Sequence, residues 1–158
     1  MTSRIPYAQR TELEKIQSQW KKANGLHVRN ESSAAIVRAA TAAELAANLA
    51  IRKEFQSKSK LSARFVDSLL IWANGIAGKI DRLLIPLTES EKHHKAIVKL
   101  KDVSARINKK RNSVAHSGEF CNPAESEAII KDAKQFVETL LHIYEPGFVL
   151  KEHGRQRA

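Results

Sequence analysis

The sequence is poor in cysteine, glycine and proline, and each shortage excludes a class of protein. The single cysteine, Cys121, cannot form a disulfide within the chain, so an oxidising compartment is not indicated. Six glycines and four prolines are too few for an all-β domain, which needs a turn about every ten residues. No stretch alternates apolar and polar residues with a period of two. The sequence therefore predicts an all-α protein.

Long apolar runs are also missing. The first ten residues, MTSRIPYAQR, contain no apolar stretch that could serve as a secretory signal, and no run of about 18 apolar residues follows them. We therefore expect a soluble cytoplasmic protein with no membrane among its partners.

Several chemical signatures are absent as well. The chain has no glycine-rich phosphate loop and no H-E-x-x-H pair, and Cys121 alone cannot build a zinc site. His93 and His94 are adjacent, so on a helix they point about 100° apart, and no further ligand lies one turn beyond them. We expect both histidines to be solvated, and we expect neither a metal nor a cofactor.

The charge balance is strongly positive. Twenty-seven lysines and arginines against seventeen acidic residues give a net charge of +10 and an isoelectric point near 9.9. Such a surface attracts polyanions through the release of counterions, and nucleic acid is the commonest polyanion inside cells. The alternative is a basic surface that serves only solubility.

Five segments have the apolar periodicity of helices and are joined by short polar links. They cover residues 11–24, 32–55, 62–85, 88–116 and 122–144. Three of them begin with a capping signal, which pairs Thr11 with Glu14, Thr88 with Glu91, and Asn122 with Glu125. Short links force successive helices to run antiparallel. We therefore expect an up-and-down bundle of about five helices in one domain, residues 1–150, followed by a disordered basic tail, residues 151–158.

Two of these segments carry further expectations. In the third segment, we expect one apolar face to pack against the core, and we expect Gly75 and Gly78 to permit the close approach of a neighbour. That face consists of Phe65, Leu69, Trp72, Ile76 and Leu83. Gly118 is placed as the stop signal of the fourth segment.

The fourth segment contains an anomaly. One seam of this helix, with steps of three and four residues, consists of Ile97, Leu100, Ser104, Ile107, Arg111 and Val114. Arg111 occupies a position where an aliphatic side chain is expected, and a guanidinium is rarely buried without a partner. Two explanations remain open: a structural ion pair, or a seam that opens into a solvated cleft where the arginine meets an anion.

The second segment offers a partner for either explanation. Glu44 and Asn48 interrupt an apolar strip formed by Val37, Ile51 and Phe55. Glu44 is therefore a candidate ion-pair partner of Arg111. Asn48 is a candidate supporting residue, and the alternative is a satisfied polar group of the core.

At this point the residues resemble a family. The sequence RNSVAH, residues 111–116, near the end of the penultimate helix of a basic bundle, resembles the R-[polar]-x3-H signature of HEPN domains. The resemblance implies a compact bundle of four to five helices that dimerises, with Arg111 and His116 at the dimer cleft and Asn112 as the polar residue after the arginine. Many members are metal-independent ribonucleases that act as toxins or in defence. The position two residues after the histidine holds Gly118 and not the tyrosine of toxins silenced by nucleotidylation, which argues against that regulation.

The chemistry suits these residue types. RNA is cleaved by attack of its own 2′-hydroxyl, which needs proton transfer and stabilisation of a crowded phosphorane. Histidine transfers protons at neutral pH, and arginine donates a planar fork of hydrogen bonds to phosphate oxygens. A symmetric dimer would bring two histidines to one cleft. The cations just before the motif, Arg106, Lys109 and Lys110, are candidates for contact with RNA.

Three functions follow for comparison. The first is an endoribonuclease with a toxin or defence role, controlled by an antitoxin or another partner protein. The second is a catalytically inactive HEPN module that binds a nucleotide or a partner. The third is an unrelated helical binder of nucleic acid, in which Arg111 and His116 are dispensable.

Overall fold

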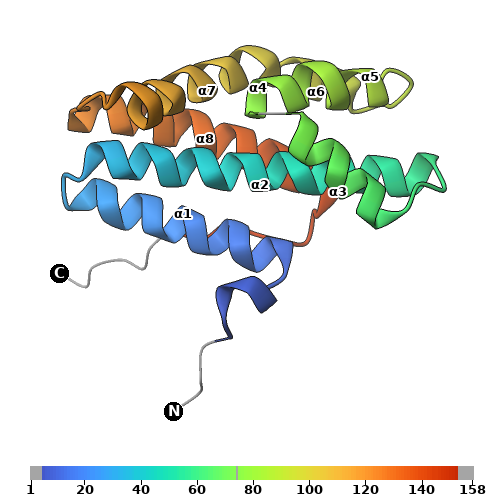
Figure 1. The fold of residues 1–158 in the computed structure, drawn as a ribbon, viewed down its shortest axis with the longest axis horizontal. Coiled ribbons are helices and arrows are strands. Elements are labelled where there is room, and N and C mark those ends of the chain that lie inside the picture. The colour runs from blue at the N-terminus through green and yellow to red at the C-terminus, as the bar shows by residue number, and fades with distance from the viewer. Residues whose placement is uncertain (1–4, 74, 153–158) are drawn as a thin grey trace.

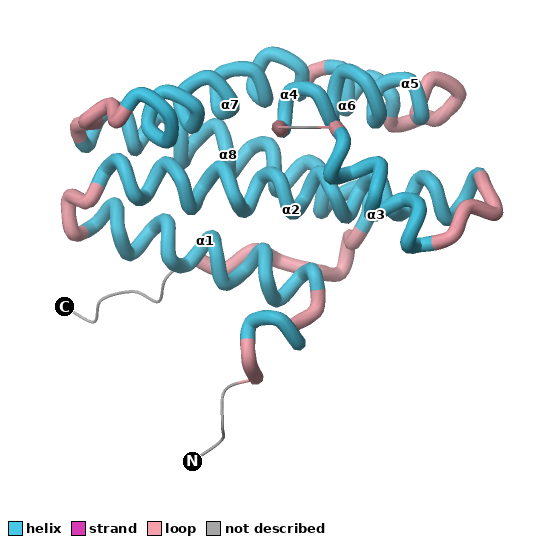
Figure 2. The backbone as a smooth tube through the Cα atoms, viewed as in Figure 1, coloured by secondary structure: helices cyan, strands magenta, loops and turns pink. Residues whose placement is uncertain are grey.

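The computed structural model describes residues 5–73 and 75–152. Within these ranges 78% of the residues are helical and no strand occurs, so the predicted all-α class is confirmed (Figures 1 and 2). The helices are α1 (Glu12–Val28), α2 (Ser32–Lys58), α3 (Ala63–Trp72), α4 (Ile76–Gly78), α5 (Ile85–Leu87), α6 (His94–Val98), α7 (Leu100–Ser117) and α8 (Pro123–Tyr144). A 3₁₀ turn at Tyr7–Gln9 precedes α1, and a π-helical stretch at Lys79–Leu84 joins α4 to α5.

The central element is α2. In Figure 1 it lies between α1 on one side and α7 on the other, and α8 packs along it. Its buried face is made mostly of alanines, which allow the neighbouring helices to approach closely. Fully buried large side chains from the surrounding helices complete the core; they include Trp20, Ile80, Ile107 and Phe136.

Length and composition would allow α2 to cross a membrane, which differs from the sequence expectation that no segment is apolar enough. In the described structure 61% of its most apolar window is buried against the other helices. The core helix of a bundle has the same composition, because it is surrounded by apolar neighbours.

Two of the three predicted capping boxes are confirmed. Thr11 accepts a hydrogen bond from the backbone of Glu14 at 3.2 Å, and the Glu14 carboxylate accepts one from the Thr11 backbone at 3.1 Å. Asn122 and Glu125 make the same reciprocal pair at the start of α8. The predicted end of the first helix at residues 24–25 is wrong, because α1 continues to Val28.

The third predicted segment, residues 62–85, does not form one helix. Three ion pairs with α2 show the direction in which this part of the chain runs: Asp67 with Arg52, Lys79 with Glu44, and Glu91 with Lys58. The chain therefore runs back along α2 in α3, reverses, and then runs forward again. Gly75 follows the reversal with a φ of +79°, a left-handed conformation that favours glycine. The count of about five helices is not confirmed, because this reversal divides the segment.

This reversal changes which side of α3 is buried. Val66 and Leu70 face the core. Two members of the predicted apolar face do not: Phe65 is 49% exposed and Trp72 is 88% exposed, and the neighbouring Ile71 is 76% exposed. The prediction failed because it extended one helical phase across a break in the helix.

The predicted start of the fourth helix is also wrong. Thr88 is buried and donates its hydroxyl to the Leu84 carbonyl at 2.9 Å, so it ends α5 and caps no helix. The Glu91 carboxylate accepts a hydrogen bond from Lys58. Regular helix begins only at α6. Gly118 ends α7 with a φ of +62°, as predicted.

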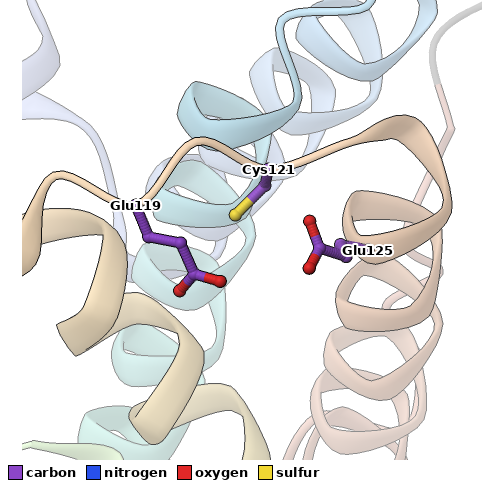
Figure 3. A group of neighbouring side chains, drawn as sticks. All are labelled: Glu119, Cys121 and Glu125. Atoms are coloured by element: carbon purple, nitrogen blue, oxygen red, sulfur yellow. The ribbon is translucent and has the colours of Figure 1, made fainter.

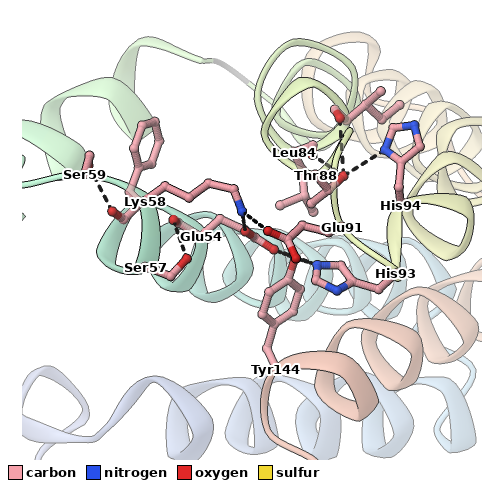
Figure 4. A network of polar contacts seen from close by, with 12 residues as sticks. Glu54, Ser57, Lys58, Ser59, Leu84, Thr88, Glu91, His93, His94 and Tyr144 are labelled. Atoms are coloured by element: carbon pink, nitrogen blue, oxygen red, sulfur yellow. Dashed lines mark hydrogen bonds and ion pairs between the residues drawn. The ribbon is translucent and has the colours of Figure 1, made fainter.

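A polar network around Glu54 joins the far ends of α2 and α8 to the turn before α6 (Figure 4). The Glu54 carboxylate, 3% exposed, accepts hydrogen bonds from Lys58 at 2.7 Å, Tyr144 at 2.6 Å and the His93 ring at 2.7 Å. His94 contacts the Thr88 hydroxyl at 3.1 Å. Both histidines are half-buried and hydrogen-bonded, so the expectation that they are solvated is wrong.

The start of the predicted disordered tail is held in place. The Lys151 backbone exchanges two hydrogen bonds of 2.7 Å with the Gln17 side chain, and Glu152 forms an ion pair with Lys134 at 2.6 Å. The prediction for residues 153–158 lies outside the described residues.

Candidate functional site

A polar cleft of about 430 Å³ opens between α2, α4 and α7. Its lining consists of Ala40, Thr41 and Glu44 from α2, Gly75 and Ile76 at the start of α4, and Asn108, Arg111, Asn112 and His116 from α7. The three residues of the RNSVAH motif that the sequence singled out thus lie in one cleft, together with Glu44.

Helical spacing explains why α7 supplies four of these side chains. Residues three and four apart lie on the same face of a helix, and the steps from Asn108 to Arg111, Asn112 and His116 follow this spacing. Glu44 follows Ala40 and Thr41 on α2 by the same rule. Two helical faces that the sequence predicts separately therefore form opposite walls of the cleft.

The turn at Gly75 brings the third wall close to α7. A Cβ atom at this position would lie 2.6 Å from Oδ1 of Asn108, so any other residue would force this amide to shift, and the φ of +79° also favours glycine. The expectation that Gly75 allows a close neighbour is therefore confirmed, whereas at Gly78 no atom lies within 4 Å of such a Cβ.

Arg111 is half-buried in the cleft. Nη1 donates a hydrogen bond of 3.3 Å to Oδ1 of Asn112, and within the described parts of the chain the guanidinium takes part in no ion pair. Most of its donors therefore face the cleft without a protein acceptor. Of the two explanations for a charged residue in this seam, the solvated cleft agrees with the structure.

The alternative, an ion pair between Glu44 and Arg111, is not formed. Glu44 instead accepts a hydrogen bond of 2.8 Å from Nζ of Lys79, the first residue of the π-helical stretch. The Lys79 side chain is 4% exposed, and the Glu44 side chain is 39% exposed. Lys79 therefore neutralises the carboxylate that was a candidate partner of Arg111.

His116 lies at the exposed end of the cleft, one turn beyond Asn112 in the last turn of α7. Neither ring nitrogen has a hydrogen-bond partner among the residues that the structure describes. Its imidazole is therefore accessible to a bound ligand.

Asn48 is not part of the lining. It lies one turn beyond Glu44 on α2, and its Oδ1 atom is buried with no hydrogen-bond partner in the described residues. It is therefore not the satisfied core amide that was one alternative. A supporting role remains a prediction.

The three cations expected to contact RNA are not in the cleft. Arg106 is held by Asp132 through two hydrogen bonds of 3.0 Å, and Lys110 contacts Glu119 at 2.7 Å and Glu125 at 3.1 Å. Lys109 is exposed, but it lies about 200° around α7 from Arg111, at about 100° per residue. None of the three cations lies beside Arg111, so the structure does not bring them into one site with the motif.

Glu119, Cys121 and Glu125 form a cluster of possible metal ligands (Figure 3). Both carboxylates already bind Nζ of Lys110, whose pKa these contacts raise, so an ammonium group lies where a cation would be held. Burial raises the pKa of the Cys121 thiol and disfavours the thiolate that metals and electrophiles require. The cluster is best explained as a structural tie between α7 and α8.

Comparisons of the chain with models of protein families, with curated proteins and with solved structures give no match. The resemblance to HEPN domains therefore rests on the sequence alone.

Sequence reasoning missed Lys79 and Asn108, and it missed the reversal of the chain before Gly75. A signal for this reversal was present, since Asn74-Gly75 is a dipeptide typical of turns. Lys79 and Asn108 carried no signal of their own, because their importance comes from contacts with residues 35 and 33 positions away.

Proposed function

We propose that this chain is a metal-independent endoribonuclease of the HEPN type. The observation that carries the proposal is the cleft itself: its lining includes the guanidinium of Arg111, which forms no ion pair among the described residues, and the imidazole of His116, which forms no hydrogen bond among them. The family resemblance adds a toxin or defence role in the cytoplasm and an antitoxin as a possible partner.

In the proposed reaction, each step is assigned to a particular side chain. The 2′-oxygen of the RNA attacks the adjacent phosphorus and loses its proton to one imidazole. The bond to the 5′-oxygen breaks, and a second imidazolium protonates this leaving group. The products are a 2′,3′-cyclic phosphate and a free 5′-hydroxyl. Arg111 donates hydrogen bonds to the non-bridging oxygens as their negative charge grows, and Asn112 fixes one edge of the guanidinium.

The pair of Glu44 and Lys79 supports this division of roles. If Glu44 were bound to Arg111, the carboxylate would compete with phosphate for the same donors. Its contact with Lys79 at 2.8 Å leaves the guanidinium available. We therefore assign Lys79 as a positioning residue of the site.

The test is incubation of the purified protein with mixed RNAs, with and without EDTA. We expect cleavage at an equal rate in both samples and products that end in 2′,3′-cyclic phosphate, since histidine and arginine supply the proton transfer and the charge stabilisation. An activity lost with EDTA and restored by a divalent cation would contradict the mechanism.

An inactive nucleotide-binding module is the second candidate. The cleft volume of about 430 Å³ falls within the range of sites that bind small ligands, and a single Arg111 suffices to hold a phosphate. This candidate predicts that a nucleotide protects the protein against heat and that RNA stays intact.

The proposed reaction uses two imidazoles, and His116 is the one histidine among the described residues that line the cleft. We therefore propose a homodimer in which the partner supplies the second imidazole. Phe65, Ile71 and Trp72 form an exposed apolar side of α3. Trp72, the last of them, lies three residues before Gly75, which lines the cleft. An uncovered apolar face beside an incomplete site favours a second copy of the chain as its cover.

Sedimentation should report about twice the chain mass of 17.7 kDa for the wild-type protein. We expect Trp72→Glu to shift the mass toward a monomer without changing the helical circular dichroism, because the side chain is 88% exposed and contributes little to the fold. Val149→Glu, at a position 73% exposed in the C-terminal segment, is the matched control and should remain dimeric. A wild-type monomer at tens of micromolar, or a dimeric Trp72→Glu variant, would contradict the proposal.

A further inference from the structure

A second and larger hollow, of about 920 Å³, is lined mainly by residues of α1. In Figure 1, α1 lies on the side of α2 away from α7. We call this hollow the basic groove. Its cationic lining residues are Arg10, Lys21, Lys22, Arg29 and Arg38; other lining residues include Tyr7, Glu14 and Phe148. The N-terminal turn, α1, the first half of α2 and the C-terminal segment thus build it together.

The positive charge of the groove is largely uncompensated. Among the described residues, Arg29 is the only one of its lining cations in an ion pair, with Glu31 at 3.2 Å. Arg10 and Arg38 donate instead to neutral acceptors, the Ser18 hydroxyl and the Gln19 amide oxygen. By contrast, Arg106 and Lys110 of α7 and Lys134 of α8 are all paired with carboxylates.

Among the described lining residues one is acidic, Glu14, which forms no ion pair with the five cations and offsets at most one of their charges. The Glu14 carboxylate accepts the backbone hydrogen bond that caps α1, at 3.1 Å from the nitrogen of Thr11. Four cations of the groove, Arg10, Lys21, Lys22 and Arg38, therefore have no carboxylate partner among the described residues.

The ring of Tyr7, a lining residue of the basic groove, has three side-chain cations near it. The side-chain cations of Arg10, Lys15 and Lys22 lie 5.7, 5.6 and 5.8 Å from the centre of its ring. Three cations around one ring repel one another, and an anion bound between them relieves this repulsion. The buried Gln19 holds the arrangement, because its amide donates to the Tyr7 hydroxyl at 3.0 Å and accepts from Arg38 at 3.2 Å.

We propose that the basic groove binds single-stranded nucleic acid, with its cations on the phosphates and Tyr7 beside a base. Cationic grooves that contain an aromatic side chain are typical of proteins that bind single strands without sequence preference. A flat membrane surface would reach only the rim of a concave groove. An acidic peptide would satisfy the cations and would leave Tyr7 without a base.

The inference deepens the proposed function by giving the RNA substrate a second contact outside the cleft. Arg38 of the groove and Thr41 of the cleft lie three residues apart on α2, so the same stretch of this helix borders both sites. The binding of nucleic acid in the groove, however, does not depend on catalysis in the cleft.

The test measures binding of a labelled 2′-O-methyl oligouridine, which has no free 2′-hydroxyl and cannot be cleaved, by fluorescence anisotropy over a range of salt concentrations. The groove variant combines Lys21→Gln, Lys22→Gln and Arg38→Gln. Its matched control combines Lys92→Gln, Lys95→Gln and Lys99→Gln, which removes three exposed charges outside the groove. Circular dichroism and thermal melting confirm that both variants are folded.

We expect the groove variant to bind more weakly and to lose about two units from the slope of log affinity against log salt, because each phosphate contact contributes about 0.7. The control variant should keep most of the wild-type slope. Tyr7→Leu should weaken binding about fivefold or more at an unchanged slope, since it removes stacking and no charge. A DNA oligothymidine should bind in the groove like the RNA probe, because phosphates and bases are common to both.

Three results would overturn the proposal: equal loss of slope in both charge variants, wild-type affinity in the groove variant, or equal competition by polyglutamate. The groove proposal and the nuclease proposal are contradicted by different results. Groove-dependent binding by a protein that leaves RNA intact would contradict the proposed nuclease alone. Cleavage and binding that are unchanged in the groove variant would contradict the groove alone.

Discussion

Replacing His116 with alanine is expected to lower the rate of RNA cleavage by about 10²–10⁴-fold, because the substitution removes proton transfer to and from the reacting oxygens. The fold should not change. The imidazole is exposed at the end of α7 and has no hydrogen-bond partner within the described structure, so its loss leaves no buried group unsatisfied. Initial rates with a labelled RNA, measured beside thermal melts, test both parts.

Arg111→Ala should cause a comparable loss in the same assay, of about 3–4 kcal/mol in transition-state stabilisation. Arg111→Lys should recover little, because an ammonium lacks the two-pronged geometry of the guanidinium. The melting temperature should change little, since Glu44 is paired with Lys79 and loses no partner.

Lys109→Ala is the control for these variants, because Lys109 is an exposed cation on another face of the same helix. It should retain wild-type activity. A large fall in the melting temperature of Arg111→Ala, with unchanged activity per folded molecule, would make Arg111 a structural residue and contradict the catalytic assignment.

Glu54→Ala is expected to reduce the free energy of unfolding by about 3–5 kcal/mol, the range for removing one partner of a buried ion pair. The substitution leaves Lys58, His93 and the Tyr144 hydroxyl without their common acceptor (Figure 4). Glu91→Ala is the matched control. Glu91 also binds Lys58, but its side chain is 37% exposed, so its loss should cost about 1 kcal/mol or less. Urea unfolding of the three proteins measures the difference, and equal midpoints would contradict this account.

The same carboxylate gives stability a defined dependence on pH. Burial by itself would raise the pKa of Glu54, but hydrogen bonds from Lys58, Tyr144 and His93 outweigh it and hold the pKa below its ordinary value of 4.5. The ionised form therefore stabilises the fold fully above about pH 4.5, and this contribution is lost as the pH falls through the lowered pKa. The stability difference between the wild type and Glu54→Gln should accordingly shrink in acid.

Local signals in the sequence were enough to predict much of the fold. The caps at Thr11 and Asn122 were correct because a capping box needs only residues three positions apart. The left-handed stop at Gly118 was correct for the same reason. Where the signal was ambiguous, the prediction failed: residues 62–85 have the periodicity of one helix, and the reversal before Gly75 depends on the packing of α4 against α7.

The candidate site, like the fold, has features that follow from local sequence signals and features that depend on tertiary packing. The sequence by itself determined that α7 carries an arginine in its apolar seam, because steps of three and four residues place Arg111 in line with Ile107 and Val114, and that a histidine follows five residues later. Only the tertiary structure decided that Arg111 has no ion-pair partner among the described residues, since its candidate partner Glu44 binds Lys79, which is 35 residues away along the chain. It also decided which cations are free: Arg106 and Lys110 meet carboxylates from α8 and the loop before it, whereas Lys21 and Lys22 meet none among the described residues. Charge composition is a property of the sequence, but neutralisation depends on which side chains the fold brings within about 4 Å of one another.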